Sequence, residues 1–154
     1  MADSSDISLA QICDAIESTL DDATDMGRSE SYDALSESPR SGDTPVLQVY
    51  PQSGDCDIEN KADRSTFGAH VRQRQYLFHA DLLARKRSHL KDDMKKTTEM
   101  IEAMEDILEA QKTGPAFSLD GIKALHWRWE RLIFQPTTDD QFMGARFYIT
   151  VKVW

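Results

Sequence analysis

The feature that most constrains the fold of this chain is a run of side chains that recur at alternating spacings of three and four residues. An apolar stripe with this spacing is typical of the seam of a coiled coil, which is buried only against a second helix. Polar seam members, here an arginine and a threonine, fix register or oligomer number at a cost in stability. The predicted oligomerisation seam consists of Ala80, Leu83, Arg87, Leu90, Met94, Thr97, Ile101, Met104 and Leu108.

The helix that carries this seam is predicted to be long. Ser65 or Thr66 can start it, no proline interrupts residues 66–112, and Gly114-Pro115 ends the pattern. About 47 helical residues would span roughly 70 Å, so the helix needs a partner along its length. We therefore assign residues 64–114 to a coiled-coil oligomerisation helix, whose partner is a second copy of the chain or another coiled-coil helix.

The acidity of the chain is concentrated before this helix. Residues 1–63 carry fifteen Asp and Glu residues against three Lys and Arg residues, a balance of −12, whereas the whole chain carries −9. Such a segment repels nucleic acid and other acidic surfaces, and it can compete for a basic site on a partner.

Residues 1–26 predict a short, acidic, amphipathic helix. Ser8 and Gln11 have the spacing of a capping box, and Ile7 and Ile12 have that of a hydrophobic staple. The apolar face permits two interpretations: the helix packs on the body of the protein, or it orders on entering a groove of a partner protein. The residues of this candidate partner-binding helix are Ile7, Leu9, Ile12, Ile16 and Leu20.

Residues 27–63 have the composition of a disordered linker, because Ser, Gly, Pro and acidic residues dominate. Their one apolar patch, residues 46–50, is interpreted as incidental, with a short β-addition motif as the alternative. Ser38-Pro39 and Thr44-Pro45 resemble proline-directed phosphorylation sites, and Ser18 resembles an acid-directed one. Phosphates there would make the segment still more acidic.

Residues 115–154 predict a small helix-strand unit. Ser118 is placed as the cap of a helix, and residues 146–153 alternate as a strand. Trp127 and Phe134 are assigned to a separate flank of the helix as a candidate interface. A lone strand needs a partner strand, either across an oligomer interface or in a longer chain of which this unit is the front part. The helix face consists of Ile122, Leu125, Trp129, Leu132 and Ile133, and one strand face of Phe147, Ile149, Val151 and Val153.

Motifs for catalysis or metal binding are not recognisable in the sequence. The four histidines and two cysteines lack ligand spacing, and no phosphate-binding glycine loop, nucleophile elbow or paired-carboxylate pattern occurs. We therefore expect no enzymatic activity, no cofactor and no metal.

The acidic N-terminus does not resemble a signal peptide, and no apolar run reaches eighteen residues. The expected location is the cytoplasm, with access to the nucleus left open, and no membrane partner is expected.

A basic stretch at residues 85–87 offers a nucleic-acid interpretation. Neighbouring acids, including Asp81 and Asp92, neutralise it, so a solvated helix flank is favoured over direct nucleic-acid binding. With the acidic N-terminus as an activation segment, the same features would describe a transcriptional regulator, which is the third function considered.

The order of these segments resembles that of phosphoproteins of negative-strand RNA viruses. The resemblance rests on layout and composition over the whole chain: an acidic N-terminal helix, a Ser-rich linker, a central oligomerising segment and a compact C-terminal unit. It implies a nucleoprotein chaperone and polymerase cofactor, with residues 7–20 occupying the nucleoprotein.

The sequence thus predicts a mainly α fold with a disordered acidic N-terminal tail, a long central coiled coil, and a C-terminal helix plus one β-strand. The predicted function is that of a non-enzymatic, oligomeric interaction protein, such as an adaptor or complex subunit.

Overall fold

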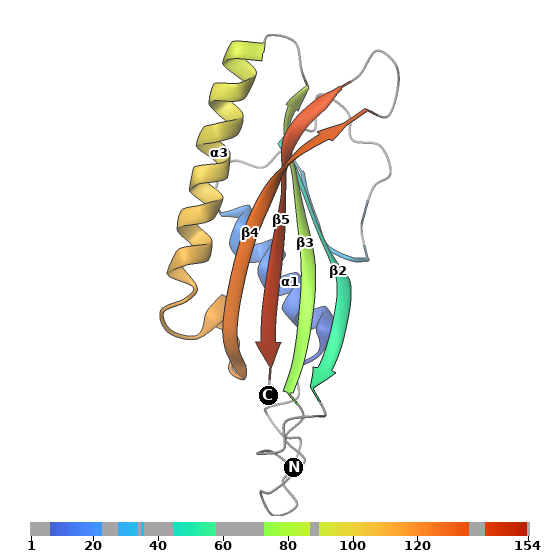
Figure 1. Ribbon diagram of the computed structural model, residues 1–154, viewed down its shortest axis with the longest axis vertical. Helices are drawn as coiled ribbons and strands as arrows, with labels where there is room; N and C mark the ends of the chain where they lie inside the picture. The colour runs from blue at the N-terminus through green and yellow to red at the C-terminus, as the bar shows by residue number, and fades with distance from the viewer. Residues whose placement is uncertain are drawn as a thin grey trace, which may run out of the picture.

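The computed structural model describes residues 7–22, 28–33, 35, 45–57, 73–86, 90–135 and 141–153. Figure 1 shows a twisted sheet with α1 crossing behind it and α3 running lengthwise beside it. The strands lie in the order β1-β2-β3-β5-β4; β1 is parallel to β2, and the other neighbours are antiparallel. The elements are α1 (Leu9–Asp21), β1 (Arg28–Glu30), β2 (Val46–Asp57), β3 (Gln73–Lys86), α3 (Leu90–Ala110), the 3₁₀ turn η2 (Ala116–Ser118), β4 (Ile122–Phe134) and β5 (Phe142–Val153).

The prediction of a mainly α fold with a long coiled coil is wrong, because the structure is a five-stranded mixed sheet with two helices. The predicted helix 64–114 is divided: its seam residues Ala80 and Leu83 lie in β3, whereas Leu90 begins α3. Arg87 lies outside the described residues. Met94, Thr97, Ile101, Met104 and Leu108 do lie on a helix, but that helix has 21 residues.

The strand β3 explains the error. Its apolar run from Tyr76 to Leu83 fits helical spacing and also the near-continuous pattern of a central strand. No Gly or Pro separates it from α3, so the sequence contains no break signal there. In the fold, β3 pairs with β2 on one side and β5 on the other, and these long-range partners override local helix preference.

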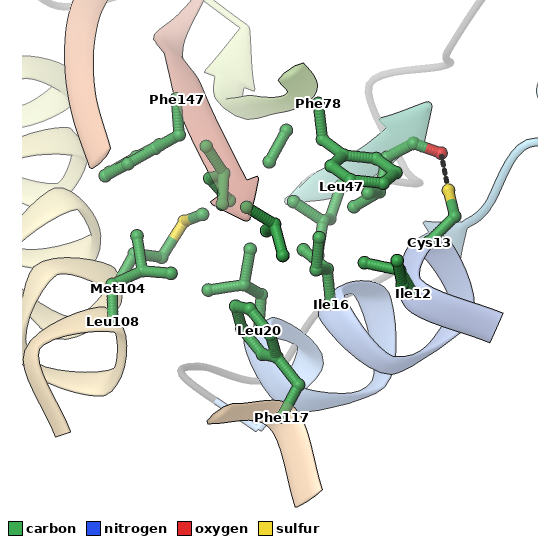
Figure 2. Close-up of a cluster of buried hydrophobic side chains, with 14 of the residues drawn as sticks. Ile12, Cys13, Ile16, Leu20, Leu47, Phe78, Met104, Leu108, Phe117 and Phe147 are labelled. Atoms are coloured by element: carbon green, nitrogen blue, oxygen red, sulfur yellow. Dashed lines mark hydrogen bonds between the residues drawn. The ribbon is translucent and has the colours of Figure 1, made fainter. Parts of the chain in front are cut away.

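The apolar stripe of α3 has the predicted spacing but packs on the sheet. Thr97, Ile101, Met104 and Leu108 are buried, and the last three belong to the main hydrophobic core. Figure 2 shows Met104 and Leu108 pointing toward side chains of the sheet and of α1. From Thr97 to Leu108 the stripe is therefore buried within one chain, whereas Met94 is exposed.

The helix α1 begins with the predicted capping box. The Gln11 backbone N–H donates to Ser8 Oγ at 3.1 Å, and the Ser8 N–H donates to Gln11 Oε1 at 2.9 Å. Its apolar side chains enter the same core as α3, and the Cys13 thiol donates to the Val49 carbonyl of β2 at 3.3 Å (Figure 2). The interpretation in which this helix packs on the body of the protein is the one that the structure shows.

Part of the segment predicted to be a disordered linker forms sheet. β1 and β2 lie within residues 27–63, and the apolar patch that begins at Val46 is the first half of β2. The physical reason is pairing: Val46 to Pro51 lie opposite Phe78 to Leu83 of β3, and Leu47 and Val49 are fully buried. Ser38 and Thr44 lie outside the described residues, whereas Ser18 is exposed on α1.

The C-terminal strand is confirmed as β5, and the four residues predicted to share one of its faces, Phe147, Ile149, Val151 and Val153, are fully buried. The helix predicted before it is wrong, because residues 122–134 form β4, which is paired along its length with β5. Its alternation Leu125, Trp127, Trp129 has period two, and this competed with the helical spacing.

The backbones of β3 and β5 are in close contact at Gly144. β3 contains a bulge between Leu83 and Arg85, opposite Gly144 of β5. A Cβ atom on Gly144 would lie 1.6 Å from the Leu82 carbonyl oxygen. Glycine is therefore required at this position, because any side chain would force the two strands apart.

In the part of the chain that the structure describes, no helix is both long and apolar enough to cross a membrane.

Candidate interaction surface

The two faces of the sheet have different coverings. Side chains from β2, β3, β4 and β5 pack against α1 and α3 on one face, which we call the covered face. The alternate side chains of the same strands point to the other face, which we call the open face. The covered face holds the core, so surfaces for recognition are sought on the open face and at the sheet edges.

A bonded polar group lies at the centre of the open face. Arg146 of β5 donates to both carboxylate oxygens of Asp81 in β3, from Nε at 2.7 Å and from a terminal nitrogen at 3.1 Å. The Tyr50 hydroxyl of β2 donates to the same carboxylate at 2.7 Å. Because Asp81 is nearly buried, this bidentate, charge-assisted pair links the three central strands.

The group continues toward β4 through aromatic rings. The ring of His79 contacts the rings of Tyr50 and Tyr148 edge-on, at centroid distances of 5.5 and 4.8 Å. The guanidinium of Arg128 lies 3.9 Å from the centroid of Tyr148. Glu130 accepts from Arg128 at 2.7 Å and from the Tyr148 hydroxyl at 3.1 Å. The Arg146–Asp81 pair thus joins two strands, and the Arg128–Glu130 pair lies along β4.

Three side chains of this group have shifted pKa values. Burial raises the pKa of Tyr50 and the hydrogen bond to Asp81 raises it further, so the phenol stays protonated. Burial lowers the pKa of His79, as does the nearby Arg146. Hydrogen bonds from Arg128 and Tyr148 lower the pKa of Glu130. Tyr50 and His79 are therefore neutral at neutral pH, and Glu130 is ionised.

A smaller apolar cluster occupies one end of the open face. Val46, Leu83 and Phe142 are buried there, with Leu132 and Phe134 packed against them. Phe134, which the sequence assigned to an interface, therefore belongs to this cluster. Trp127 lies on the covered face, so the structure does not bring these two residues together.

The edge of the sheet formed by β4 carries exposed apolar side chains. β4 has 13 residues and is the last strand in the sheet order, with β5 as its neighbour on one side. Two large side chains on its covered-face side are exposed, Trp129 at 40% and Ile133 at 44%, and Met94 of α3 is exposed at 37%. A long edge strand with exposed apolar side chains is a template for pairing with another chain.

Trp127 anchors this edge strand to the helix layer. Its Nε1 donates to Glu109 of α3 at 2.9 Å, and its ring lies 6.4 Å from that of Phe147. Lys112 lies 5.8 Å from the indole centroid and pairs with Glu109 at 2.8 Å. The hydrogen bond from Lys112 is the main cause that lowers the pKa of Glu109. The middle of β4 is thus fixed to α3, and the covered-face side chains toward its C-terminal end, Trp129 and Ile133, are more exposed.

The opposite edge of the sheet is protected. β1 pairs with Val46–Gln48 of β2. Farther along β2, Pro51 has no N–H to donate, and the register shifts between Pro51 and Ser53. Proline and irregular register both discourage the addition of another strand. Among the described strands, β4 therefore offers the better template.

The candidate partner-binding helix is occupied within the chain. Ile7, Ile12, Ile16 and Leu20 are buried, and Leu9 is the exposed member at 36%. Burial raises the pKa of the neighbouring Cys13 thiol to about 11, so it is a packing residue rather than a reactive thiolate. Among the described residues, no group of three or more His, Cys, Asp and Glu side chains is placed to hold a metal ion.

Comparison with protein-family models and with curated protein sequences found no match for this chain. The interaction surface therefore rests on the geometry of β4. The signal that could have found it is the period-two alternation of residues 125–134, since an aromatic alternating run next to a second alternating run predicts a β-hairpin.

Proposed function

We propose that this protein is a non-enzymatic interaction protein, an adaptor or complex subunit of the cytoplasm, which binds an extended polypeptide segment along β4. The observation that carries the proposal is the exposed 13-residue edge strand with Trp129 and Ile133 on one side. In strand addition, main-chain hydrogen bonds supply affinity and alternate side chains supply specificity. The joining element is a strand edge, in place of the coiled coil expected from the sequence.

The polar group of the open face supports this proposal indirectly. Its charges are bonded to one another, and its tyrosine and histidine are held in their neutral forms. It links the neighbouring strands β2, β3, β5 and β4. An edge that is held in place in this way loses little conformational entropy when a partner strand binds.

The proposal is tested with a labelled synthetic peptide that has the sequence of residues 122–134 and serves as the added strand. We expect saturable binding to the intact protein by fluorescence anisotropy. Replacing Trp129 and Ile133 together by Lys should weaken binding at least about tenfold, because charged edge side chains oppose pairing. The matched control is Leu9→Lys, which changes an exposed apolar residue of α1 and should leave binding unchanged.

Equal affinity of the Trp129→Lys/Ile133→Lys variant and the unmodified protein would overturn the proposal. Circular dichroism checks that the variant is folded. As an independent measurement, hydrogen exchange should show slower exchange of β4 amides when the peptide is bound, with β2 amides unaffected.

A further inference from the structure

The sequence of β4 is complementary to itself. Two β4 strands can pair antiparallel about a two-fold axis that is perpendicular to the sheet. When this axis passes at Trp129, each residue of one strand lies opposite the residue of the other strand that is equally far from Trp129 in the opposite direction. Such an axis keeps the covered face of both copies on the same side, and directly opposite residues share a face. The question is which residue of β4 can lie on the axis.

Charge excludes the registers next to Trp129. An axis at Arg128, Glu130 or Arg131 would place that charged side chain opposite its own copy. An axis at Trp127 would place Lys123 opposite Arg131. Like charges directly opposite each other are destabilising. An axis at Trp129 avoids all of these pairs.

With the axis at Trp129, the open-face pairs become favourable. Arg128 of each copy lies opposite Glu130 of the other, so two ion pairs form, one on each side of the axis. Both side chains already point to the open face, where Arg128 lies on Tyr148 and Glu130 accepts its hydrogen bond. The two carboxylates and two guanidiniums would form one network across the joint.

The same register buries the exposed side chains of the covered face. Trp129 meets its copy, Ile133 meets Leu125, and Arg131 lies opposite Trp127. Trp129 and Ile133 are the two described side chains of β4 that are both large, apolar and exposed. The backbone of α3 approaches β3 and β5, and its last turn reaches β4 through the contact of Glu109 with Trp127.

We propose that a second copy of this chain is the partner of β4, paired antiparallel about Trp129. This inference rests on the proposed function, that β4 accepts an added strand, and it names the occupant. The two described sheets then form one continuous sheet with the helices of both copies on the same side.

The test is a charge exchange followed by sedimentation velocity on the intact chain. The unmodified protein should sediment as a dimer. Arg128→Glu should weaken its own dimer by about tenfold to a hundredfold, because each substitution acts twice across the two-fold axis, and Glu130→Arg should do the same. Lys152→Glu is the matched control, since it reverses a charge on the open face of β5 away from the axis, and it should remain dimeric.

Mixing the two weakened variants decides the register. The Arg128→Glu chain carries acids at both positions 128 and 130, and the Glu130→Arg chain carries bases at both. Every acid of one chain then faces a base of the other, so the mixture should form heterodimers with the affinity of the unmodified protein. Within each variant chain, positions 128 and 130 carry like charges and cannot pair with each other. Restored dimerisation in the mixture therefore comes from the contact between the two copies. Mixtures that stay monomeric, or single variants that dimerise like the unmodified protein, would overturn the inference.

Two outcomes separate this inference from the proposed function. A monomeric protein that still binds the residue 122–134 peptide at β4 rejects the second copy and keeps strand addition. A monomeric protein that does not bind the peptide rejects both. If a variant fails to fold, hydrogen exchange of the unmodified protein at low and high concentration gives the decision: concentration-independent exchange of β4 amides contradicts the dimer.

Discussion

Phe147 and Tyr148 are adjacent in β5, yet they belong to two faces of the sheet that are stabilised in different ways. Phe147 is fully buried among apolar side chains beneath the helices. Tyr148 is half-buried and contacts His79, Arg128 and Glu130. Burial of apolar area is non-directional, whereas a polar network contributes only when each partner is present. The covered face thus supplies the bulk of stability, and the open face supplies a defined arrangement of charge.

The largest effect is expected on the covered face. Phe147→Ala should lower the free energy of unfolding by about 3–5 kcal/mol, because it leaves a cavity between α3 and the sheet and removes the ring beside Trp127. Tyr148→Phe is the control on the opposite face; it keeps the ring and loses one exposed hydrogen bond. Urea denaturation measures both, and equal losses would contradict the contrast between the faces.

Breaking the centre of the open face should have an intermediate effect. Asp81→Ala leaves Arg146 and the Tyr50 hydroxyl without their shared carboxylate, and the expected loss is about 1–3 kcal/mol. Glu130→Gln, at an exposed carboxylate of the same network, should have a smaller effect, because solvent screens its interactions. Thermal unfolding of the two variants ranks them, and a reversed order would show that Asp81 is not the structural centre of this face.

The capping box of α1 should contribute about 1 kcal/mol to stability. Ser8→Ala removes the acceptor for the Gln11 N–H and should destabilise the protein by that amount. Ser18→Ala, at an exposed position within the same helix, is the control and should be neutral or slightly stabilising, because alanine favours helix. Denaturant midpoints that shift equally in both variants would contradict a role for the cap.

The smallest effect is a dependence of stability on pH from the open face. Burial and Arg146 lower the pKa of His79 in the folded protein below its ordinary value of about 6.5. The unfolded chain therefore binds the His79 proton more readily than the folded protein does. The contribution of His79 to stability is complete above about pH 6.5 and is lost as the pH falls below it. His79→Gln should flatten the corresponding part of the stability curve, measured by denaturation between about pH 5 and pH 7 at half-unit steps. An unchanged curve would show that His79 does not titrate differently on folding.

Local patterns were read correctly where one period was dominant and the partner was close in sequence. The capping box of Ser8 and Gln11, the buried face of α1 as one of two interpretations, and the alternation of β5 are all present in the structure. The stripe from Thr97 to Leu108 has the predicted helical spacing. The sequence did not specify which surface covers this stripe. A sheet can bury the apolar side chains as well as a second helix can.

The candidate surface was missed for a related reason. Residues 122–134 fit both a helical face and an alternating strand, and the helical interpretation placed Trp129 in a core and Trp127 at an interface. In the structure, Trp127 is anchored by Glu109, and Trp129 is the more exposed of the two. The pairing of β4 with β5 decides between the periods, and it does so through hydrogen bonds that no local pattern encodes.

The sequence by itself determined the helix start at Ser8, the apolar stripe of α3, the strand β5 and the uneven distribution of charge, because each depends on neighbours within a few residues. Only the tertiary structure decided that residues 76–83 form a central strand, that β2 emerges from an acidic segment, and that β4 is an edge. Those outcomes depend on which strands meet across long stretches of chain, and pairing and shared burial outweigh the small local preferences that favoured a single long helix.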